Sequence, residues 1–274
     1  MADESKAKSL LSRTAPIRFA LRQFAEGQKL KAEIRKLIMT YGRKIILQVQ
    51  KLMGRYSLIG DRQFFGSENF PWSREIEANW QTIRQELDEV MQHHDQLPNF
   101  QDISPDQKKI ATDDKWKTFF FFAYGLRSED NLRRCPQTAR LLEKIPGAKT
   151  AFFSILTGRK HIPEHCGPYK GVIRYHLGLI VPKEKEACRI RVGDTIAHWE
   201  EGKSLFFDDT FPHEVWNNTD SMRVVLFMDI LRPLPAPVSL LNDLIIRIIA
   251  ASPFIQDAKK NHDEWEKRMA ALWN

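Results

Sequence analysis

Five of the eight histidines fall within residues 161–213 of the 274-residue chain. They are His161, His165, His176, His198 and His213. Neutral imidazole is a common ligand of divalent metal ions. We expect His165 to lie in the loop PEHCGPYKG and His213 to open the strand HEVW. If the ends of two neighbouring strands bring these imidazoles together, they can hold a metal, although spacing alone is weak ground for that prediction.

Arginines alternate with apolar residues in two other segments. In GVIRYHLGLIVP, period two places Arg174 and His176 on one face. In MRVVLFMDI both faces are largely apolar, so Arg223 is expected to point into an interior, where its charge needs an anionic partner. Guanidinium pairs well with carboxylate, so the two arginines suggest a bound carboxylate. The alternative for Arg174 and His176 is a solvent-exposed face.

The elements that must position these residues are short strands between about residues 115 and 234. Six segments are rich in β-branched and aromatic residues and are separated by Gly, Pro and Asp, which is typical of strands. They are TFFFFAY, TAFFSILT, GVIRYHLGLIVP, CRIRVG, KSLFFDD and MRVVLFMDI. Strands at this density indicate a sandwich or barrel such as a jelly roll. We therefore predict a mostly β core with helical flanks, an α+β chain.

Helical periodicity marks both flanks of this core. Residues 17–53 and 73–94 carry apolar positions at helical spacing, with Lys and Arg between those of the first stretch. After three prolines, residues 240–249 form a third, strongly apolar helix, and a polar helical tail follows Pro253. The predicted organisation is a basic amphipathic helical region over 1–110, the β domain over 111–235 and a helical tail over 236–274.

The charge is concentrated at the start of the chain. The whole sequence carries a net charge of +7, whereas residues 1–56 hold thirteen Lys and Arg against four Asp and Glu, a net charge of +9. The remainder is therefore nearly neutral, which argues against a nucleic-acid partner. A basic amphipathic helix fits peripheral contact with an anionic membrane, and its alternative is packing on its own domain.

Targeting signals are weak in this chain. Three cysteines without a CxxC pair indicate reduced thiols. The first residues lack the apolar run of a signal peptide, and no apolar stretch is long enough to cross a bilayer. We expect a cytoplasmic protein, peripheral to the inner membrane if the basic helix binds lipid.

Three longer segments together resemble the aspartyl/asparaginyl β-hydroxylase family. They are HCGPYKGVIRYHLGLIVP, WEEGKSLFFDDTFPHEVWN and MRVVLFMDILRP, and the resemblance runs from about Trp116 to Pro233. It implies a double-stranded β-helix (a jelly roll, cupin-like) and an Fe(II)- and 2-oxoglutarate-dependent dioxygenase that uses O2. The family also includes bacterial hydroxylases of lipid A acyl chains.

The resemblance also implies roles for single residues. His165 and His213 correspond to the iron ligands, and Arg223 to the residue that holds the distal carboxylate of 2-oxoglutarate. Further positions that match the lining of the cosubstrate pocket are Arg174, His176, Ser154 and, beside it, Trp116. Asp209 matches an acid near the metal-bound water, and its alternative is an ordinary turn or cap aspartate. Gly167 departs from the usual two-histidine, one-carboxylate triad, as the resembling family also commonly does.

Several functions remain open from the sequence. Animal members that hydroxylate peptidyl Asp or Asn resemble this chain but have a second arginine where it has Val172, which favours a lipid acyl chain as substrate. The alternatives are a peptidyl Asp/Asn β-hydroxylase and a non-catalytic jelly-roll module that holds an acidic ligand. A zinc hydrolase would need a third ligand, taken from His161, His176 or His198.

Overall fold

The computed structural model describes residues 46–270. The chain divides into two compact units, 1–51 and 52–274, and everything below concerns the second. Residues 46–55 are helical, whereas the rest of the helix predicted over 17–53 lies outside the described residues, and with it the proposed membrane contact of that helix. The boundaries predicted at residues 110 and 235 stay a prediction.

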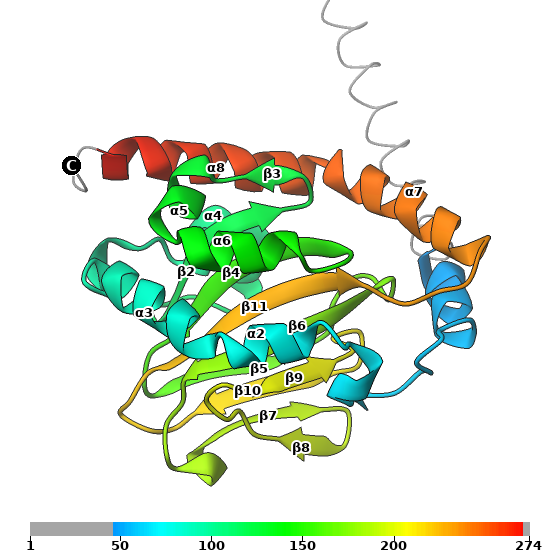
Figure 1. Cartoon of the computed structure of the whole chain (residues 1–274), viewed down its shortest axis with the longest axis horizontal. Coiled ribbons are helices and arrows are strands. Elements are labelled where there is room, and N and C mark those ends of the chain that lie inside the picture. Colours follow the sequence, from blue (N-terminus) through cyan, green and yellow to red (C-terminus); the bar gives the residue numbers. More distant parts are fainter. Residues whose placement is uncertain (1–45, 271–274) are drawn as a thin grey trace, which may run out of the picture. The chain divides into compact units, whose positions relative to one another are not determined.

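Two antiparallel sheets form the core of the second unit (Figure 1). The larger sheet has, in order, β1 (Phe64–Phe65), β9 (Ser204–Phe207), β6 (Val172–Ile180), β11 (Arg223–Leu231), β4 (Ala148–Leu156), β2 (Trp116–Ala123) and β3 (Leu126–Arg127). The smaller sheet has, in order, β5 (Lys160–His165), β10 (His213–Asn217), β7 (Cys188–Val192) and β8 (Thr195–Ala197). This is the predicted jelly roll, and the expected strands are confirmed.

The central strands of the larger sheet are buried on both faces because each face meets its own hydrophobic cluster. One face packs against the helices through residues such as Ile173, Tyr175 and Leu226. The opposite face packs with the smaller sheet through residues such as Phe152 and Val225. Period-two alternation in β6 therefore turns Arg174 and His176 into the space between the sheets, rather than into water.

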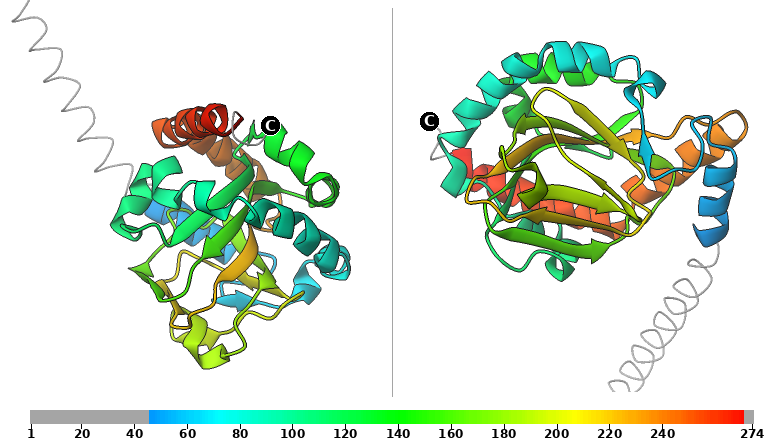
Figure 2. Two further views of the ribbon diagram at one scale, coloured as in Figure 1. Left: turned by 90° about the vertical axis from the view of Figure 1, so that its left-hand side faces the viewer. Right: turned by 90° about the horizontal axis from the view of Figure 1, so that it is seen from below.

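Helices cover the outer face of the larger sheet and one end of the unit (Figure 2). The α-helices are α2 (Ser73–Ala78), α3 (Trp80–Met91), α4 (Phe100–Ile103), α5 (Glu129–Arg134), α6 (Pro136–Glu143), α7 (Val238–Ala250) and α8 (Pro253–Ala270). Short 3-10 turns are η1 (Ser67–Asn69), η2 (His94–Gln96), η3 (Pro105–Lys109) and η4 (Lys185–Ala187). The predicted helices after Pro237 and Pro253 are confirmed.

Two predictions of local structure were wrong. His165 is the last residue of β5, not a loop residue, because β5 pairs with β10 and His165 lies opposite His213 in that register. The polar segment KHIPEH has no clear alternation, so only its partner strand makes it a strand. The helix predicted over 73–94 is divided between α2 and α3 at Asn79, whose side chain donates to the carbonyl of Glu75.

Candidate active site

The pairing of β5 with β10 brings His165 and His213 together. They are register partners, and the centroids of their rings lie 4.1 Å apart. Each Nδ1 contacts the backbone carbonyl two residues earlier, that of Pro163 at 2.8 Å and that of Phe211 at 3.0 Å. A carbonyl only accepts, so each Nδ1 carries the proton and each Nε2 keeps a lone pair. Two imidazoles held in this tautomer can ligate a divalent metal ion.

Burial keeps these imidazoles neutral. It lowers the pKa of His165, and it lowers the pKa of His213 to about 3, with the neighbouring His165 adding to the effect. Burial also lowers the pKa of His176. A neutral imidazole is the form that binds metal, so the fold maintains the binding form well below the ordinary imidazole pKa.

The stability of the metal-free protein is therefore expected to decrease as the pH is lowered. Above about pH 6.5 these imidazoles are neutral in both the folded and the unfolded chain, and the folded state has its full stability. As the pH falls from there towards 3, the unfolded chain binds protons first, so the free energy of unfolding decreases progressively. Between pH 7 and pH 5, His213 accounts for about 2 kcal/mol. Urea unfolding of chelator-treated wild type and His213→Asn at both pH values should show a shallower loss in the variant. Parallel losses would contradict the assignment.

Asp209 fills the space beside His165 that a triad carboxylate would occupy. A Cβ built on Gly167 would lie 2.2 Å from the Asp209 carboxyl group, and the Gly167 N–H donates to the Asp209 backbone carbonyl at 2.6 Å. The Asp209 side chain is buried, and burial raises its pKa against the opposing effect of Arg174. The glycine two residues after His165 is thus matched by a carboxylate supplied from the β9–β10 turn.

Substituting Gly167 by Ala should displace Asp209 and destabilise the fold by about 1–3 kcal/mol, as overpacking does. A double-mutant cycle isolates the cause. In an Asp209→Ala background, Gly167→Ala should cost less than about 0.5 kcal/mol in urea unfolding, because the group it contacts is gone. An equal cost in both backgrounds would show that Asp209 is not what occupies this space.

Arg174 is held between two buried carboxylates. Its Nη2 donates to Asp209 at 2.6 Å and its Nε donates to Asp229 at 2.8 Å, and its guanidinium lies 4.1 Å from the centroid of the Phe227 ring. Burial opposes the charge, but Asp209 and Asp229 together raise the pKa of Arg174. Its positive charge is therefore satisfied inside the protein.

Arg223 has the opposite environment. It is 2% exposed, and its Nε and Nη1 have no hydrogen-bond partner among the described residues. Trp199 lies beneath the guanidinium at 4.6 Å and donates from its indole N–H to Nδ1 of His176 at 3.1 Å. Because Nδ1 of His176 accepts, its Nε2 carries the proton, and this buried N–H is also without a partner among those residues. Arg223 and His176 thus form a buried set of donors that suits a carboxylate.

The remaining predicted residues, Trp116 and Ser154, lie on β2 and β4, on the other side of β11 from β6. The Trp116 indole donates to the Ser154 hydroxyl at 3.0 Å. Asp229, the register partner of Arg174, lies six residues along β11 from Arg223, or about 20 Å along the strand. A single carboxylate therefore cannot contact both arginines, contrary to the expectation from the sequence that the two arginines bind one carboxylate. The assignment of Arg174 to the cosubstrate stays a prediction.

A cavity of about 250 Å³ opens beside His165. Its polar end contains His165, Arg174, Asp209 and Asp229, and α8 contributes Ile255, Ala258 and His262. Its aromatic wall consists of Phe100, Trp116, Phe120, Phe121, Phe122, Tyr124, Phe152 and Phe227. The cavity thus joins His165, one of the paired histidines, to a largely apolar space, as expected for a site that orients an apolar ligand.

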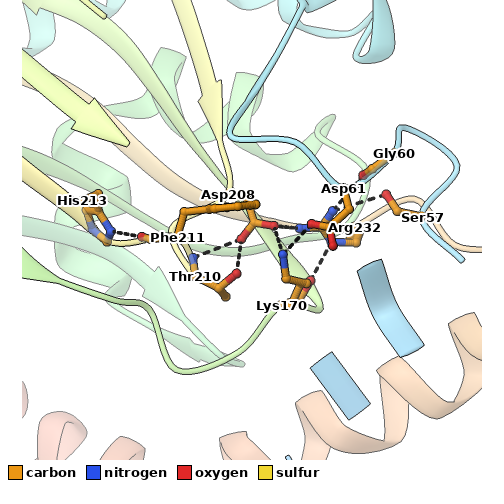
Figure 3. A network of polar contacts seen from close by, with 9 residues as sticks. All are labelled: Ser57, Gly60, Asp61, Lys170, Asp208, Thr210, Phe211, His213 and Arg232. Atoms are coloured by element: carbon orange, nitrogen blue, oxygen red, sulfur yellow. Dashed lines mark hydrogen bonds and ion pairs between the residues drawn. The ribbon is translucent and has the colours of Figure 1, made fainter. Parts of the chain in front are cut away.

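A second buried ion network supports the turn that carries Asp209 and His213 (Figure 3). Asp208 accepts from the Arg232 guanidinium, from Lys170 at 2.9 Å and from the backbone N–H of Thr210 at 3.0 Å. The side chains of Asp208 and Arg232 are both 0% exposed. Lys170 also contacts Asp61 at 2.6 Å. The β9–β10 turn is thereby fixed to the loop after His165.

The sequence missed four of these charged residues, namely Lys170, Asp208, Asp229 and Arg232. A charge inside an apolar run needs a buried partner, and Asp229 in MRVVLFMDI carried that signal. The partners themselves come from distant strands. Of the other candidate ligands, His161 contacts Glu214 at 2.6 Å and His198 contacts the Lys185 carbonyl at 2.8 Å, so neither is directed at His165 and His213.

Comparison with known proteins gives the family. Residues 77–233 match the sequence profile described as "Aspartyl/Asparaginyl beta-hydroxylase". The chain is 45% identical over 227 residues to the ornithine lipid ester-linked acyl 2-hydroxylase of Rhizobium tropici, covering 83% of this chain and 81% of that protein. It is 35% identical to human aspartyl/asparaginyl beta-hydroxylase over 58% of this chain and 21% of that protein. A prolyl-4-hydroxylase structure from Pseudomonas putida matches 56% of this chain and 88% of that chain, with 13% identity and a TM-score of 0.37.

The family match covers more than half of the chain, and the rhizobial relative aligns with most of it. The matched residues include both paired histidines, Arg174 and Arg223, and the aromatic strands that line the cavity. The resemblance noted in the sequence is confirmed: this chain belongs to the aspartyl/asparaginyl β-hydroxylase family.

Proposed function

We propose that this protein is an Fe(II)- and 2-oxoglutarate-dependent hydroxylase whose substrate is the acyl chain of a membrane lipid. The observation that carries the proposal is the pairing of His165 with His213, each with its Nδ1 bonded to a backbone carbonyl, where His165 lines the polar end of an aromatic cavity. The 45% identity with an ornithine lipid acyl hydroxylase supports the lipid substrate.

The donors present fit iron and 2-oxoglutarate. His165 and His213 would hold the metal, and the orphaned N–H groups of Arg223 and His176 would hold the distal carboxylate of the cosubstrate. When bound, the metal with 2-oxoglutarate and O2 supplies the oxidising power for hydroxylation, as succinate and CO2 are released. The residues of this chain orient both carbon skeletons and exclude water from the site.

Asp209 and Arg174 have a supporting role in this proposal. The Asp209 carboxylate, held by Arg174 at 2.6 Å, faces the space next to His165 and can accept from a water molecule there. Arg174 is in turn held by Asp229. Arg174 is thus a positioning residue for Asp209 in this proposal.

Among the described residues, the cavity offers no unpaired guanidinium to an acidic substrate. Two arginines among these residues line the cavity, and both are already paired with carboxylates. Arg174 is held by Asp209 and Asp229, and Arg127 pairs with two surface glutamates, so neither guanidinium is free to receive an acidic side chain. The aromatic wall, in contrast, offers apolar contacts to a hydrocarbon chain. Peptidyl Asp or Asn, the substrate suggested by the name of the human relative, fits this cavity less well.

The test is mass spectrometry of lipid extracts from cells that make ornithine lipids and express the chain. Wild type is expected to yield a lipid one oxygen atom heavier, and His165→Ala/His213→Ala is expected to yield none. His198→Ala, which alters an imidazole directed at the Lys185 carbonyl, is the matched control and should behave as wild type.

Each outcome separates the candidates. Iron-dependent succinate formation without an oxidised lipid would retain the hydroxylase and reject the lipid substrate, and a peptide substrate would then be tested first. Absence of succinate formation with any substrate would favour a non-catalytic binding module. Tight stoichiometric zinc with no response to 2-oxoglutarate would favour a hydrolase.

A further inference from the structure

Helix α7 presents an apolar face to solvent. Leu240, Leu244 and Ile248, spaced four residues apart, are 66%, 54% and 63% exposed. The opposite face is buried through Val238, Asn242 and Ile246. Apolar residues on the exposed face of a helix, in addition to the buried face, indicate that this face is covered by another apolar surface or by lipid.

Helix α7 lies beside two elements that line the cavity. Asn242 accepts from the Tyr169 hydroxyl at 2.7 Å and donates to the Gly171 carbonyl at 2.8 Å, which attaches α7 to the loop that follows His165. Residues 166–168 of that loop line the cavity. Helix α8, which follows α7 directly, lines it through Ile255 and Ala258 (Figure 1). The apolar face of α7 therefore belongs to a helix that is attached to the loop after β5 and leads into α8, and both of these elements line the cavity.

We propose that the exposed face of α7 lies on the surface of a phospholipid bilayer and so brings the cavity to its substrate. The proposal rests on the lipid acyl substrate proposed above. A hydrophobic chain that must enter a cavity from a membrane needs the protein surface beside that cavity to contact the membrane.

The charge on the α7 face fits an anionic bilayer. At 100° per residue, exposed Arg247 lies about 20° beyond Leu240 on the helical wheel, at the edge of the apolar face. A long cationic side chain in such a face can extend its guanidinium to lipid phosphates while its neighbours insert. Asp243, the acidic residue of the helix, lies to one side of this face and is partly buried.

The geometry favours lying on the bilayer over crossing it. Within residues 46–270, no single helix is long and apolar enough to span a membrane. Residues 238–250 and 255–268 reach the required composition only as a pair bent by 52°. Ile255 and Trp265 of the second helix are buried against the protein, so that helix is not available to the lipid. An interfacial helix is the arrangement these facts allow.

Vesicle sedimentation of the full chain tests the proposal. Wild type is expected to bind phosphatidylglycerol-containing vesicles, and Leu240→Ser/Leu244→Ser/Ile248→Ser should bind at least about 30-fold more weakly, because three aliphatic insertions are lost. Ile196→Ser, at a 51% exposed position of β8, is the control and should bind as wild type. Arg247→Glu should weaken binding to anionic vesicles more than binding to phosphatidylcholine vesicles.

An activity measurement separates this proposal from the proposed function. The triple variant should hydroxylate detergent-dispersed lipid as wild type does and lose activity towards the same lipid in vesicles. If neither protein oxidises lipid but vesicle binding still depends on the α7 face, the substrate proposal fails and the docking surface stands.

Three results would overturn the docking surface. Equal vesicle binding by wild type and the triple variant is the first. The second is an absence of wild-type binding together with a lower melting temperature of the variant, which would mean that another part of this chain covers the face. The third is a wild-type dimer that the substitutions dissociate, which would assign the face to a second copy.

Discussion

An Arg223→Met variant is expected to bind 2-oxoglutarate about 100-fold more weakly and yet to be more stable than wild type when no cosubstrate is present. Truncating one partner of a buried, hydrogen-bonded charge pair costs about 2–5 kcal/mol of binding free energy, and 100-fold corresponds to about 2.7 kcal/mol. The Nε and Nη1 atoms of Arg223 have no other partner among the described residues, so the carboxylate is the group that they can satisfy.

The gain in stability has the same origin. Burial lowers the pKa of Arg223 to about 10, which reflects the cost of holding its charge away from water. Methionine of similar length removes that cost, and replacing an uncompensated buried charge by an apolar side chain should raise the free energy of unfolding by about 1–4 kcal/mol. Binding and stability should therefore change in opposite directions.

Both changes can be measured on one pair of proteins. The KM for 2-oxoglutarate, from succinate formation, gives the loss of binding, and urea unfolding without cosubstrate gives the change in stability. Arg159→Met is the control, because that arginine pairs with Asp220 at the surface, and neither quantity should change. An unchanged KM in Arg223→Met would remove Arg223 from the cosubstrate site.

An Arg232→Met variant is expected to lose about 3–5 kcal/mol of unfolding free energy, the cost of leaving a buried charge without its main partner. In this variant the Asp208 carboxylate would keep its contact with Lys170 but lose the Arg232 guanidinium. The side chains of Asp208 and Arg232 are both fully buried in the wild type. Arg232 also donates to the Lys170 carbonyl at 2.6 Å and the Gly60 carbonyl at 3.3 Å, so two loops lose an anchor with it.

Urea unfolding at pH 7 checks this, with Arg159→Met again as the unchanged control. Adding Asp208→Asn to Arg232→Met should recover part of the loss, because the isolated buried charge is then removed as well. The Arg232→Met variant should also bind metal more weakly, since the β9–β10 turn contains Asp209 and leads directly into His213. A loss below about 1 kcal/mol would show that the network contributes no more than a surface ion pair.

Much of the fold could be read from local sequence. β-branched and aromatic runs such as TFFFFAY predicted β2, and MRVVLFMDI predicted both β11 and the interior position of Arg223, because a strand that is apolar on two faces has no solvent face for a charge. The apolar repeat after Pro237 predicted α7. Local predictions failed where strand pairing determines the secondary structure. The polar sequence of β5 is an example, because it becomes a strand only by pairing with β10.

The sequence by itself determined the family, the strand-rich core and the residue types available for chemistry. Only the tertiary structure decided how those residues are divided. It paired His165 with His213 across two strands and satisfied Arg174 with Asp209 and Asp229. It left Nε and Nη1 of Arg223, beside Trp199, without a hydrogen-bond partner within residues 46–270. The two arginines look alike in the sequence because alternation gives only the face of a strand. Their different roles depend on which carboxylates lie within about 3 Å, and distant parts of the chain supply those carboxylates.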